Sequence, residues 1–478
     1  MLTQALIPAA GRGLRTWPKG RTVPKVLFPL EGKPLIQHNI ELLRDHLGIR
    51  DITIIVGYEK EQIITHLGSG EALGVTIRYV TCAAPDVGLA RGMLLARPYL
   101  RDRFVTILGD TVYIDSNHRD LFSLTTSTFD AVCSLLHTTE LHEIKRNFSV
   151  TLNDNRITSL VEKPTVVENN WLGCGTYVFT PRIFDAIERT SPSPHSGRVE
   201  LTDAIQLLAQ SSPGVLAFYL KGMTFNINTI DDYHFAQFKI RALRFHDYRI
   251  SVVIPAFNEA ASIGHVVRDF KTVADEVFVV NNSSTDQTAA IAHGAGARVE
   301  TVCLKGYGDT IRFGLDHASG DILVVVEADY SFRSRDLTKL LEYLKDADMV
   351  VGTRTTRELV QQGTNMHGLV RWGNVLVAKL IEALWWTHQP RFTDVGCTYR
   401  ALWKDTYRAM KPYLRGVGPE LSPEMMIAAV RMNHRVIEVP VSYHTRIGGE
   451  SKHSANYAAI ARTAFRMLRT MARMRVEV

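Results

Sequence analysis

The spacing of hydrophobic residues predicts alternating strands and helices along the first half of the chain. Short runs rich in β-branched and aromatic residues predict strands, and apolar residues three and four positions apart predict helices. Alternation of the two is typical of βαβ units around a largely parallel sheet. Strands are predicted at residues 6–9, 52–57, 75–80, 104–108, 131–136 and 176–179, and helices at residues 35–47, 59–67, 88–96 and 201–209.

The alternation begins again near Arg249. Residues 238–248, between the two halves, are charged and aromatic and contain neither Gly nor Pro, which predicts a short helical connector. We therefore expect an α/β protein of two domains, residues 1–240 and 249–478, each with a mixed and mostly parallel sheet. In the second half, strands are predicted at residues 250–255, 276–280 and 322–326, and a helix at residues 260–272.

Composition narrows the class of protein. The chain has 478 residues, of which 45% are hydrophobic and 22% charged, as in ordinary globular proteins. The net charge of +6 suits phosphate-rich substrates or an anionic membrane surface. It is too weak to indicate nucleic-acid binding, and no nucleic-acid motif is present, so nucleic acid is not an expected partner.

Cysteine usage and hydropathy predict a cytoplasmic protein. The five cysteines are scattered and form no C-x-x-C pair, which predicts reduced thiols and no zinc site. The first residues lack the basic stretch and long apolar run of a signal peptide. No apolar run reaches the roughly 20 residues that a membrane-spanning helix needs.

A glycine-rich turn follows the first predicted strand. Its small residues Ala10, Gly11 and Gly13 would let backbone N–H groups approach phosphates. Arg15 and Lys25 follow closely, and cations beside such a turn suit a triphosphate whose negative charge grows as a bond breaks. The alternative is a plain turn with solvated basic residues.

The stretch from Gly11 to Ile36 resembles the sugar-1-phosphate nucleotidyltransferases, over about residues 1–235. The resemblance implies a Rossmann-like nucleotide-binding domain of the nucleotidyltransferase fold. It implies that Mg2+ (or Mn2+) binds to Asp110, at the end of a predicted strand, and to Asn226. It places further nucleotide and sugar contacts at Gly88, Glu162, Lys163 and Gly175.

The implied reaction needs no covalent enzyme intermediate. The oxygen of a sugar-1-phosphate attacks the α-phosphorus of an NTP, and pyrophosphate leaves. Arg15, Lys25 and Lys163 would hold charge and align the groups. The family often reads the base with a Gln near the position of Cys82, so the choice among UTP, CTP, dTTP and GTP stays open.

The second half has an apolar strand that ends at Pro255, a polar turn at residues 281–284, and the acidic pair Glu327 and Asp329 after a buried strand pattern. This order resembles family 2 glycosyltransferases, and dolichyl-phosphate mannose and glucose synthases most closely, over about residues 249–455. The resemblance implies a second Rossmann-like nucleotide-binding domain, of the GT-A fold. Glu327 and Asp329 replace the family's D-x-D metal pair, and Glu can still bind Mg2+, although its extra methylene moves the oxygens by about one bond length.

The resemblance also implies catalytic and binding residues around that metal pair. Asn282 stands where the family has a base-contacting Asp, although Asn281 is an alternative, and Thr398 stands where the family has Gly. A segment with Gly448 and Gly449 between two cations matches a loop over the donor and acceptor phosphates. The implied residues are Pro255, Asn258, Glu259 and Asn282 for the nucleotide, Asp394 for catalysis, and Arg354, Arg400, Arg446 and Lys452 for phosphates and sugar.

Two segments raise the question of membrane contact. Residues 370–388 are apolar on most sides with two tryptophans at one end, which suits either a helix at the membrane surface or a buried core helix. Residues 456–478 predict a basic amphipathic helix with Arg462, Arg466, Arg469 and Arg473 on one face. Its opposite, apolar face is predicted to contain Phe465, Leu468, Met471 and Ala472. Docking on the protein's own core and docking on anionic lipid both stay open for it.

Together these features predict a bifunctional enzyme of glycan or cell-envelope biosynthesis. One domain would make an NDP-sugar from an NTP and a sugar-1-phosphate. The other would transfer the sugar to an acceptor, with a polyprenyl phosphate at the inner face of the membrane as the leading candidate. The alternatives are a soluble or saccharide acceptor, or one domain that serves as a non-catalytic nucleotide-binding scaffold.

Overall fold

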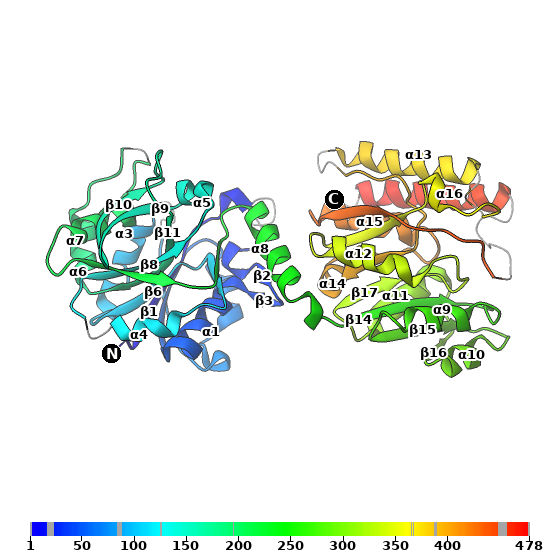
Figure 1. Cartoon of the computed structure of the whole chain (residues 1–478), viewed down its shortest axis with the longest axis horizontal. Helices are drawn as coiled ribbons and strands as arrows, with labels where there is room; N and C mark the ends of the chain where they lie inside the picture. Colours follow the sequence, from blue (N-terminus) through cyan, green and yellow to red (C-terminus); the bar gives the residue numbers. More distant parts are fainter. Residues whose placement is uncertain are drawn as a thin grey trace. The chain divides into compact units, whose positions relative to one another are not determined.

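The structure is a computed structural model that describes residues 2–16, 23–83, 88–124, 127–194, 196–364, 366, 368–386, 390–447 and 457–476. Its internal contacts divide the chain into two compact units, Met1–Gln237 and Phe238–Val478. Each unit is a central sheet with helices packed against it (Figure 1).

The first unit is built on a nine-stranded sheet within the described residues, in the order β5–β4–β1–β6–β11–β8–β12–β10–β9. The first four of these strands run parallel, and β11 lies antiparallel to both of its neighbours. The bounds are β1 (Gln4–Ala9), β4 (Asp51–Val56), β5 (Thr76–Thr81), β6 (Phe104–Ile107), β8 (Ala131–His137), β9 (Phe148–Asn153), β10 (Arg156–Glu162), β11 (Trp171–Phe179) and β12 (Val215–Leu220).

Strand β1 shows why these segments read as continuous apolar runs. Ala5 and Ile7 are buried in one hydrophobic cluster, whereas Leu6, which points to the opposite face, is buried in another. Both faces are therefore covered, as parallel sheets require.

The helices of this unit are α1 (Leu35–Leu47), α2 (Lys60–Leu67), α3 (Leu89–Leu94), α4 (Leu121–Leu124), α5 (Leu141–Arg146), α6 (Arg182–Arg189), α7 (Leu201–Ala209) and α8 (Ile230–Leu243), which extends past Gln237.

Two short ladders complete the first unit. β7 (Thr111–Ile114) pairs antiparallel with β13 (Met223–Asn226), and β2 (Pro29–Leu30) pairs with β3 (Lys33–Pro34). The first ladder matters for the site, because it brings the chain after β6 beside a segment more than 100 residues later.

The second unit contains a seven-stranded sheet within the described residues, in the order β16–β15–β14–β17–β19–β18–β20. All neighbours run parallel except β19, which is antiparallel to β17 and β18. The strands are β14 (Ile250–Ala256), β15 (Glu276–Asn282), β16 (Arg298–Val302), β17 (Ile322–Val325), β18 (Met349–Thr353), β19 (Arg400–Trp403) and β20 (Val436–Pro440). The helices are α9 (Ile263–Phe270), α10 (Thr288–Gly294), α11 (Tyr307–His317), α12 (Leu337–Leu344), α13 (Gly368–Leu384), α14 (Lys404–Met410), α15 (Leu421–Arg431) and α16 (Tyr457–Val476).

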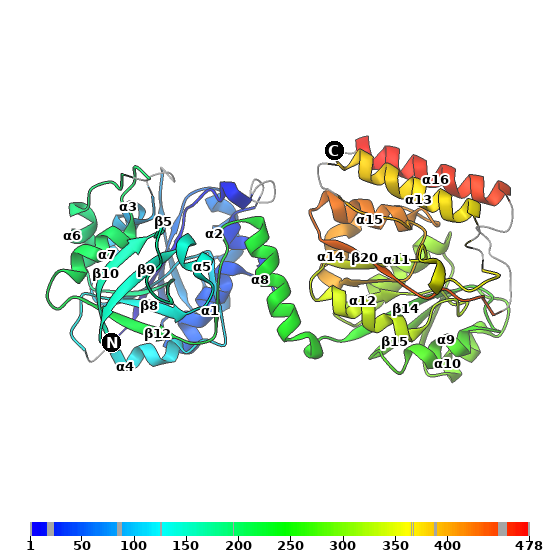
Figure 2. The same cartoon turned by 45° about the horizontal axis from the view of Figure 1, so that its top comes forward.

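Helices α13 and α16 lie side by side on the second unit, and α16 packs on α15 (Figures 1 and 2). Helix α13 buries Val377, Ala378 and Ile381, which recur at helical spacing. Trp385, just after α13, is also buried, whereas Trp386 is 71% exposed. Within the described residues, no helix is both long enough and apolar enough to cross a membrane.

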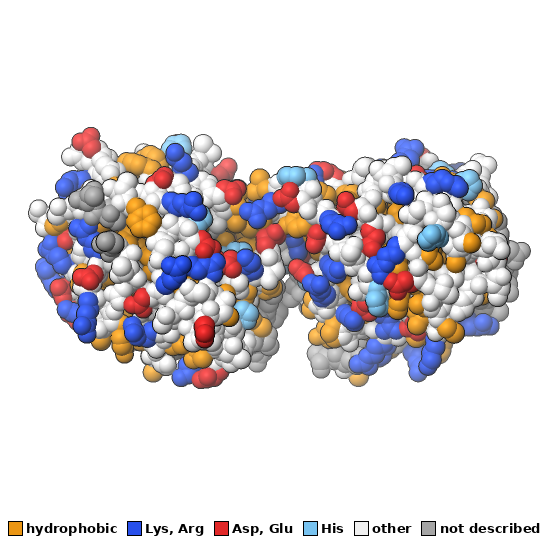
Figure 3. All heavy atoms as spheres, turned by 90° about the horizontal axis from the view of Figure 1, so that it is seen from below, with side chains coloured by type: hydrophobic (Ala, Val, Ile, Leu, Met, Phe, Trp, Pro, Cys, Tyr) orange, Lys and Arg blue, Asp and Glu red, His pale blue; other side chains and the backbone are white. Residues whose placement is uncertain are grey.

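The buried face of helix α16 agrees only in part with the predicted apolar face, of which Met471 is buried. Met467, Met471 and Met474 pack into the core of the unit, while Phe465 and Leu468 are exposed. The helix therefore docks on its own domain through methionines. On the face of the molecule drawn in Figure 3, basic and acidic side chains are interspersed over each unit, which fits the mild net charge.

The predicted fold class, α/β in two domains with mixed sheets, is confirmed. Helices α1 and α7 have the predicted bounds, but the predicted connector helix begins earlier, at Ile230. Strands β9 and β10 were not predicted. They alternate buried and exposed positions at the edge of the sheet, so they lack the continuous apolar run of a strand covered on both faces.

Two candidate active sites

The proposed metal ligands of the first unit lie on neighbouring strands. Asp110 immediately precedes β7, and Asn226 is paired with the next residue, Thr111. The backbone N–H of Ile227 donates to the backbone oxygen of Asp110 at 2.9 Å. The ladder therefore holds the backbones of Asp110 and Asn226 next to each other.

Asn226 has an unused acceptor at this edge. Its Nδ2 donates to Oδ1 of Asn147 at 2.9 Å, and its own Oδ1 is buried without a hydrogen-bond partner among the described residues. A buried, unpaired amide oxygen is costly unless something binds it. A hard cation prefers oxygen ligands of this kind, so Asp110 and Asn226 fit Mg2+ or Mn2+.

Lys25 lies beside both the glycine turn and Asp110. Lys25 Nζ lies 2.6 Å from Oδ2 of Asp110, and Arg15 donates to Oδ1 of Asn228 at 2.8 Å. Gly13 has a φ of +59°, and a Cβ there would lie 3.3 Å from the Cβ of Lys25. Only glycine adopts this tight turn without strain. Ala10 and Gly11 complete the loop between β1 and the turn.

The remaining predicted contacts of the first unit lie on other elements. Glu162 ends β10 and accepts a hydrogen bond from Thr202, and Lys163 Nζ lies 3.8 Å from Oε1 of Glu162. Burial raises the pKa of Glu162. Gly175 in β11 packs so tightly that a Cβ would lie 2.7 Å from Oγ1 of Thr111, whereas Gly88 precedes α3, beside Arg198.

Sequence reasoning missed Asn147. Its side chain accepts from Asn226, and its backbone oxygen accepts the N–H of Lys163 at 2.7 Å. It thus ties the proposed metal ligand to the proposed sugar-phosphate lysine. An isolated Asn after a short helix carries no sequence signal, because its role depends on a partner 79 residues away.

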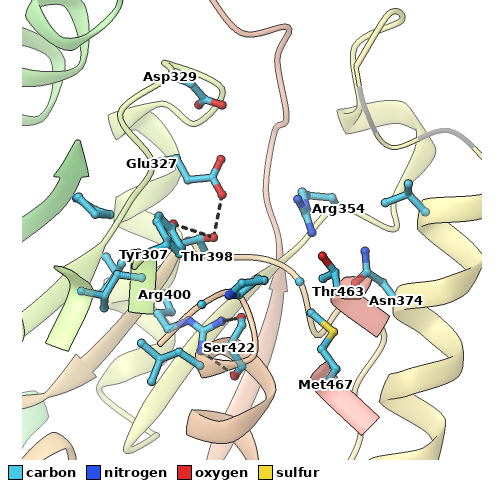
Figure 4. Close-up of a pocket in the computed structure, with 18 of the residues that line it drawn as sticks. Tyr307, Glu327, Asp329, Arg354, Asn374, Thr398, Arg400, Ser422, Thr463 and Met467 are labelled. Carbon is cyan, nitrogen blue, oxygen red and sulfur yellow. Dashed lines mark hydrogen bonds between the residues drawn. The ribbon is translucent and has the colours of Figure 1, made fainter. Parts of the chain in front are cut away.

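In the second unit, most of the predicted residues surround one cavity of about 310 Å³. Glu327 and Asp329 face Arg354 across it, and Arg400 lies at its base (Figure 4). Predicted residues that line the cavity are Pro255, Glu259, Glu327, Asp329, Arg354, Arg400 and Arg446. Lys452, like Gly448 and Gly449, lies outside the described residues.

The acidic pair has well-defined partners. Thr398 Oγ1 donates to Oε1 of Glu327 at 2.8 Å, and Arg446 Nη2 donates to Oδ2 of Asp329 at 2.8 Å. Burial, together with the charge of Asp329, raises the pKa of Glu327 to about 7. Within the described residues, Oε2 of Glu327 has no hydrogen-bond partner, so the carboxylate pair fits a divalent cation.

Asp394 is turned away from the cavity and toward Arg354. It is fully buried and accepts from Nε of Arg354 at 2.8 Å and from Nη2 at 2.9 Å. Burial opposes ionisation, but the charge and hydrogen bonds of Arg354 hold the pKa of Asp394 below its ordinary value. Its geometry suits the positioning of the Arg354 guanidinium.

Arg400 is also held by the protein. Its Nη2 donates to the backbone oxygen of Cys397 at 2.6 Å, and its Nη1 donates to that of Ser422 at 3.1 Å. Burial lowers the pKa of Arg400. The two hydrogen bonds hold the Arg400 guanidinium in one place at the base of the cavity.

The predicted base-contact region is a set of interlocked polar turns. Asn258 has a φ of +55°, and its Oδ1 accepts the N–H of Thr285 at 2.8 Å. The side chain of Asn282 accepts the N–H of Leu304 at 2.8 Å and donates to its carbonyl at 3.3 Å. Oδ1 of Asn281, in contrast, is buried without a partner among the described residues. Of the two candidates for the base contact, Asn281 is therefore the one whose side-chain oxygen is not already used by another residue.

Two further cavity residues carry no clear sequence signal. Tyr307 at the start of α11 and Asn374 in α13 both line the cavity (Figure 4).

Across the described part of the chain, no group of three or more His, Cys, Asp or Glu side chains is arranged to hold a metal. Each proposed site has two protein ligands, a number common for Mg2+, which usually also binds water and substrate phosphates.

Comparison with known proteins assigns both units. Residues 4–242 match the family model of nucleotidyl transferases, which is half of the chain. The chain belongs to the nucleotidyl transferase family. Residues 251–402 match the model of glycosyl transferase family 2, so the nucleotidyltransferase domain is fused to a glycosyltransferase domain, as predicted.

The known relatives described next match about half of this chain. The UTP–glucose-1-phosphate uridylyltransferase AglF of Haloferax volcanii is 32% identical over 230 residues, 48% of this chain and 93% of that protein. A glucose-1-phosphate thymidylyltransferase of Streptomyces griseus is 30% identical over 232 residues, which span 48% of this chain and 63% of that protein. A solved UDP-glucose pyrophosphorylase in complex with UDP-glucose is 24% identical, with a TM-score of 0.46, over 51% of this chain and all of that one.

Proposed function

We propose that the first unit makes an NDP-sugar from an NTP and a sugar-1-phosphate, and that the second unit transfers the sugar to a polyprenyl phosphate. The observation that carries the first step is the ion pair between the Asp110 carboxylate and the Lys25 ammonium, next to the strand that carries the unpaired oxygen of Asn226. The family match supports nucleotidyl transfer as the reaction class. The names of the two relatives support UTP and dTTP as the first nucleotides to test.

In the first reaction, an oxygen of the sugar-1-phosphate attacks the α-phosphorus of the NTP. The bond between the α-phosphorus and the bridging oxygen breaks, and pyrophosphate leaves. Lys25 and Arg15 bind the triphosphate, and Lys163 orients the sugar phosphate, so the groups react without a covalent enzyme intermediate.

In the second reaction, a phosphate oxygen of the acceptor attacks the anomeric carbon, and the nucleoside diphosphate leaves. Arg354 and Arg446 stabilise phosphate charge in the cavity, and Asp394 keeps Arg354 in place. An ionised phosphate is its own nucleophile, so no general base is required. In each unit a bound Mg2+ or Mn2+ would offset the charge on the phosphates. The holders are Asp110 and Asn226 in the first unit and Glu327 and Asp329 in the second.

The cavity wall supports a lipid acceptor. Beyond the charged residues, the wall is formed by apolar side chains from helices α13, α15 and α16 and from the segment before α13. A polar head group and an apolar chain would each meet matching surface there. The apolar residues are Met366, Val370, Val377, Leu421, Met425, Ile460, Ala464 and Met467.

The outer side of the same helices supports peripheral contact with the inner face of a membrane. Helix α13 exposes Trp372, Leu376 and Leu380 at four-residue spacing, and the adjacent α16 exposes Phe465 and Leu468. Exposed apolar side chains on neighbouring helices, with arginines beside them, are typical of helices that lie at a lipid surface. The acceptor would then enter the cavity from the membrane.

The test is pyrophosphate release by the full chain with Mg2+, across four NTPs and a panel of sugar-1-phosphates. A single productive pair identifies the donor, which is then supplied to the second unit with a polyprenyl phosphate. Transfer to that lipid supports the proposal. Transfer only to a soluble or saccharide acceptor contradicts it, and pyrophosphate release without any transfer points to a non-catalytic second unit.

A further inference from the structure

Two departures from the family 2 pattern meet in the structure. Glu327 stands where the resemblance implies the first Asp of a metal pair, and Thr398 stands where it implies a Gly. The residues are 71 positions apart in the chain, yet Thr398 Oγ1 lies 2.8 Å from Oε1 of Glu327 (Figure 4). Glycine could not make this hydrogen bond.

The direction of the hydrogen bonds is determined by the groups involved. Tyr307 carries a phenolic O–H, and Thr398 carries one hydroxyl that can both donate and accept. Tyr307 donates to Thr398 Oγ1 at 3.4 Å. Thr398 has one hydroxyl hydrogen, which it donates to Oε1 of Glu327. The result is a one-way chain from Tyr307 through Thr398 to Glu327.

The hydrogen bond from Thr398 restricts a carboxylate that is on a longer side chain than that of Asp. Glu has one more rotatable bond than Asp, so its carboxylate samples more positions and loses more side-chain entropy when it is held in one. Thr398 binds one oxygen and leaves the other, Oε2, without a partner among the described residues. Asp329, only two residues away, lines the same cavity.

We propose that Thr398 is a positioning residue for the cation site of the second unit: its hydroxyl holds Oε1 of Glu327 so that Oε2 and Asp329 bind the divalent cation of the donor diphosphate. The proposal rests on the proposed metal site of that unit. It treats Glu327 and Thr398 as a single functional pair. Removal of a group that orients a metal ligand typically weakens metal binding by about 10-fold to 100-fold.

The test is Mn2+ binding to the full chain, followed by electron paramagnetic resonance in the presence of a nucleoside diphosphate. An Asp110→Ala background removes the contribution of the first unit. Thr398→Val keeps the shape and loses the hydroxyl, and we expect Mn2+ affinity to fall about 10-fold. Thr398→Ser keeps the hydroxyl and is expected to stay within about twofold of the parent. Thr398→Ala, which adds no bulk, replaces the Val variant if that one does not fold.

A double-mutant cycle separates positioning from a general structural effect. Glu327→Gln should weaken Mn2+ binding far more than Thr398→Val does, and in that background Thr398→Val should have no further effect on the residual affinity. If Thr398→Val binds Mn2+ like Thr398→Ser, the positioning role is wrong while the metal site stands. If Glu327→Gln leaves Mn2+ binding unchanged, the proposed metal site is wrong, and the positioning role falls with it.

Discussion

Lys25 Nζ lies 2.6 Å from Oδ2 of Asp110, so the proposed phosphate-binding cation of the first unit is paired with its proposed metal ligand. The second unit repeats the relationship, with Arg446 at 2.8 Å from Asp329. Each cation neutralises a carboxylate that would otherwise face a partly enclosed site alone. We infer that the Lys and Arg change partners, from carboxylate to phosphate, as substrate enters.

The first prediction separates the two sites. Asp110→Ala should lower pyrophosphate release by about 100-fold or more, because it removes both a proposed metal ligand and the partner of Lys25. Transfer from a supplied NDP-sugar should be unchanged. Asp329→Ala is the matched variant and should have the reverse effect. If Asp110→Ala also abolished transfer, the two reactions would not occupy separate sites.

The second prediction concerns the buried pair of Arg354 and Asp394, whose side chains are 8% and 0% exposed. Asp394→Asn leaves a buried guanidinium without its counter-charge, and we expect the second unit to lose about 3–5 kcal/mol of unfolding free energy. Asp405→Asn is the control, because it removes a pair with exposed Arg408 that contributes about 0.5 kcal/mol or less. Urea-dependent hydrogen exchange on peptides of the second unit measures both. Equal effects would show that burial of the pair contributes nothing.

The third prediction is a pH dependence of stability in the first unit. His118 is fully buried between Ser116 and Thr176, and burial lowers its pKa to about 3. In the unfolded chain the pKa is near 6.5, so the unfolded state alone binds a proton below that pH. Stability is therefore fully present above about pH 6.5 and is lost as the pH falls toward about 3.

Because of this difference in pKa, His118 should make the free energy of unfolding about 2 kcal/mol smaller at about pH 5 than at about pH 7.5. His118→Gln retains hydrogen-bonding groups and does not titrate, so its unfolding free energy should fall less over the same interval. Urea unfolding at the two pH values measures the difference. An identical pH dependence in the two proteins would contradict the assignment to His118.

The fourth prediction tests the exposed face of α13. Trp372→Glu combined with Leu376→Glu should reduce flotation with phosphatidylglycerol-rich vesicles by about tenfold or more, because it replaces apolar contact with charge that anionic lipid repels. Tyr343→Glu, on the exposed surface of α12, is the control and should float like the parent. If the parent protein does not float, the soluble or saccharide acceptor is favoured instead.

The sequence determined most of the elements that are covered on both faces. Strands β1, β4, β14 and β15 are continuous apolar runs, and each was predicted within two residues of its bounds, because burial on both faces leaves a local signal. Groups that are close in sequence also lie together in the structure, such as the pair Glu327 and Asp329 in one cavity, and their roles stay proposals.

Tertiary structure alone decided which of these groups touch. Asn147 meets Asn226 across 79 residues, and Thr398 meets Glu327 across 71. It also decided that Asp394 faces Arg354, and that α16 buries its methionines instead of Phe465. Such contacts leave no local pattern, because a hydrogen bond depends on distance and direction in space, whereas the sequence lists only residue type and order.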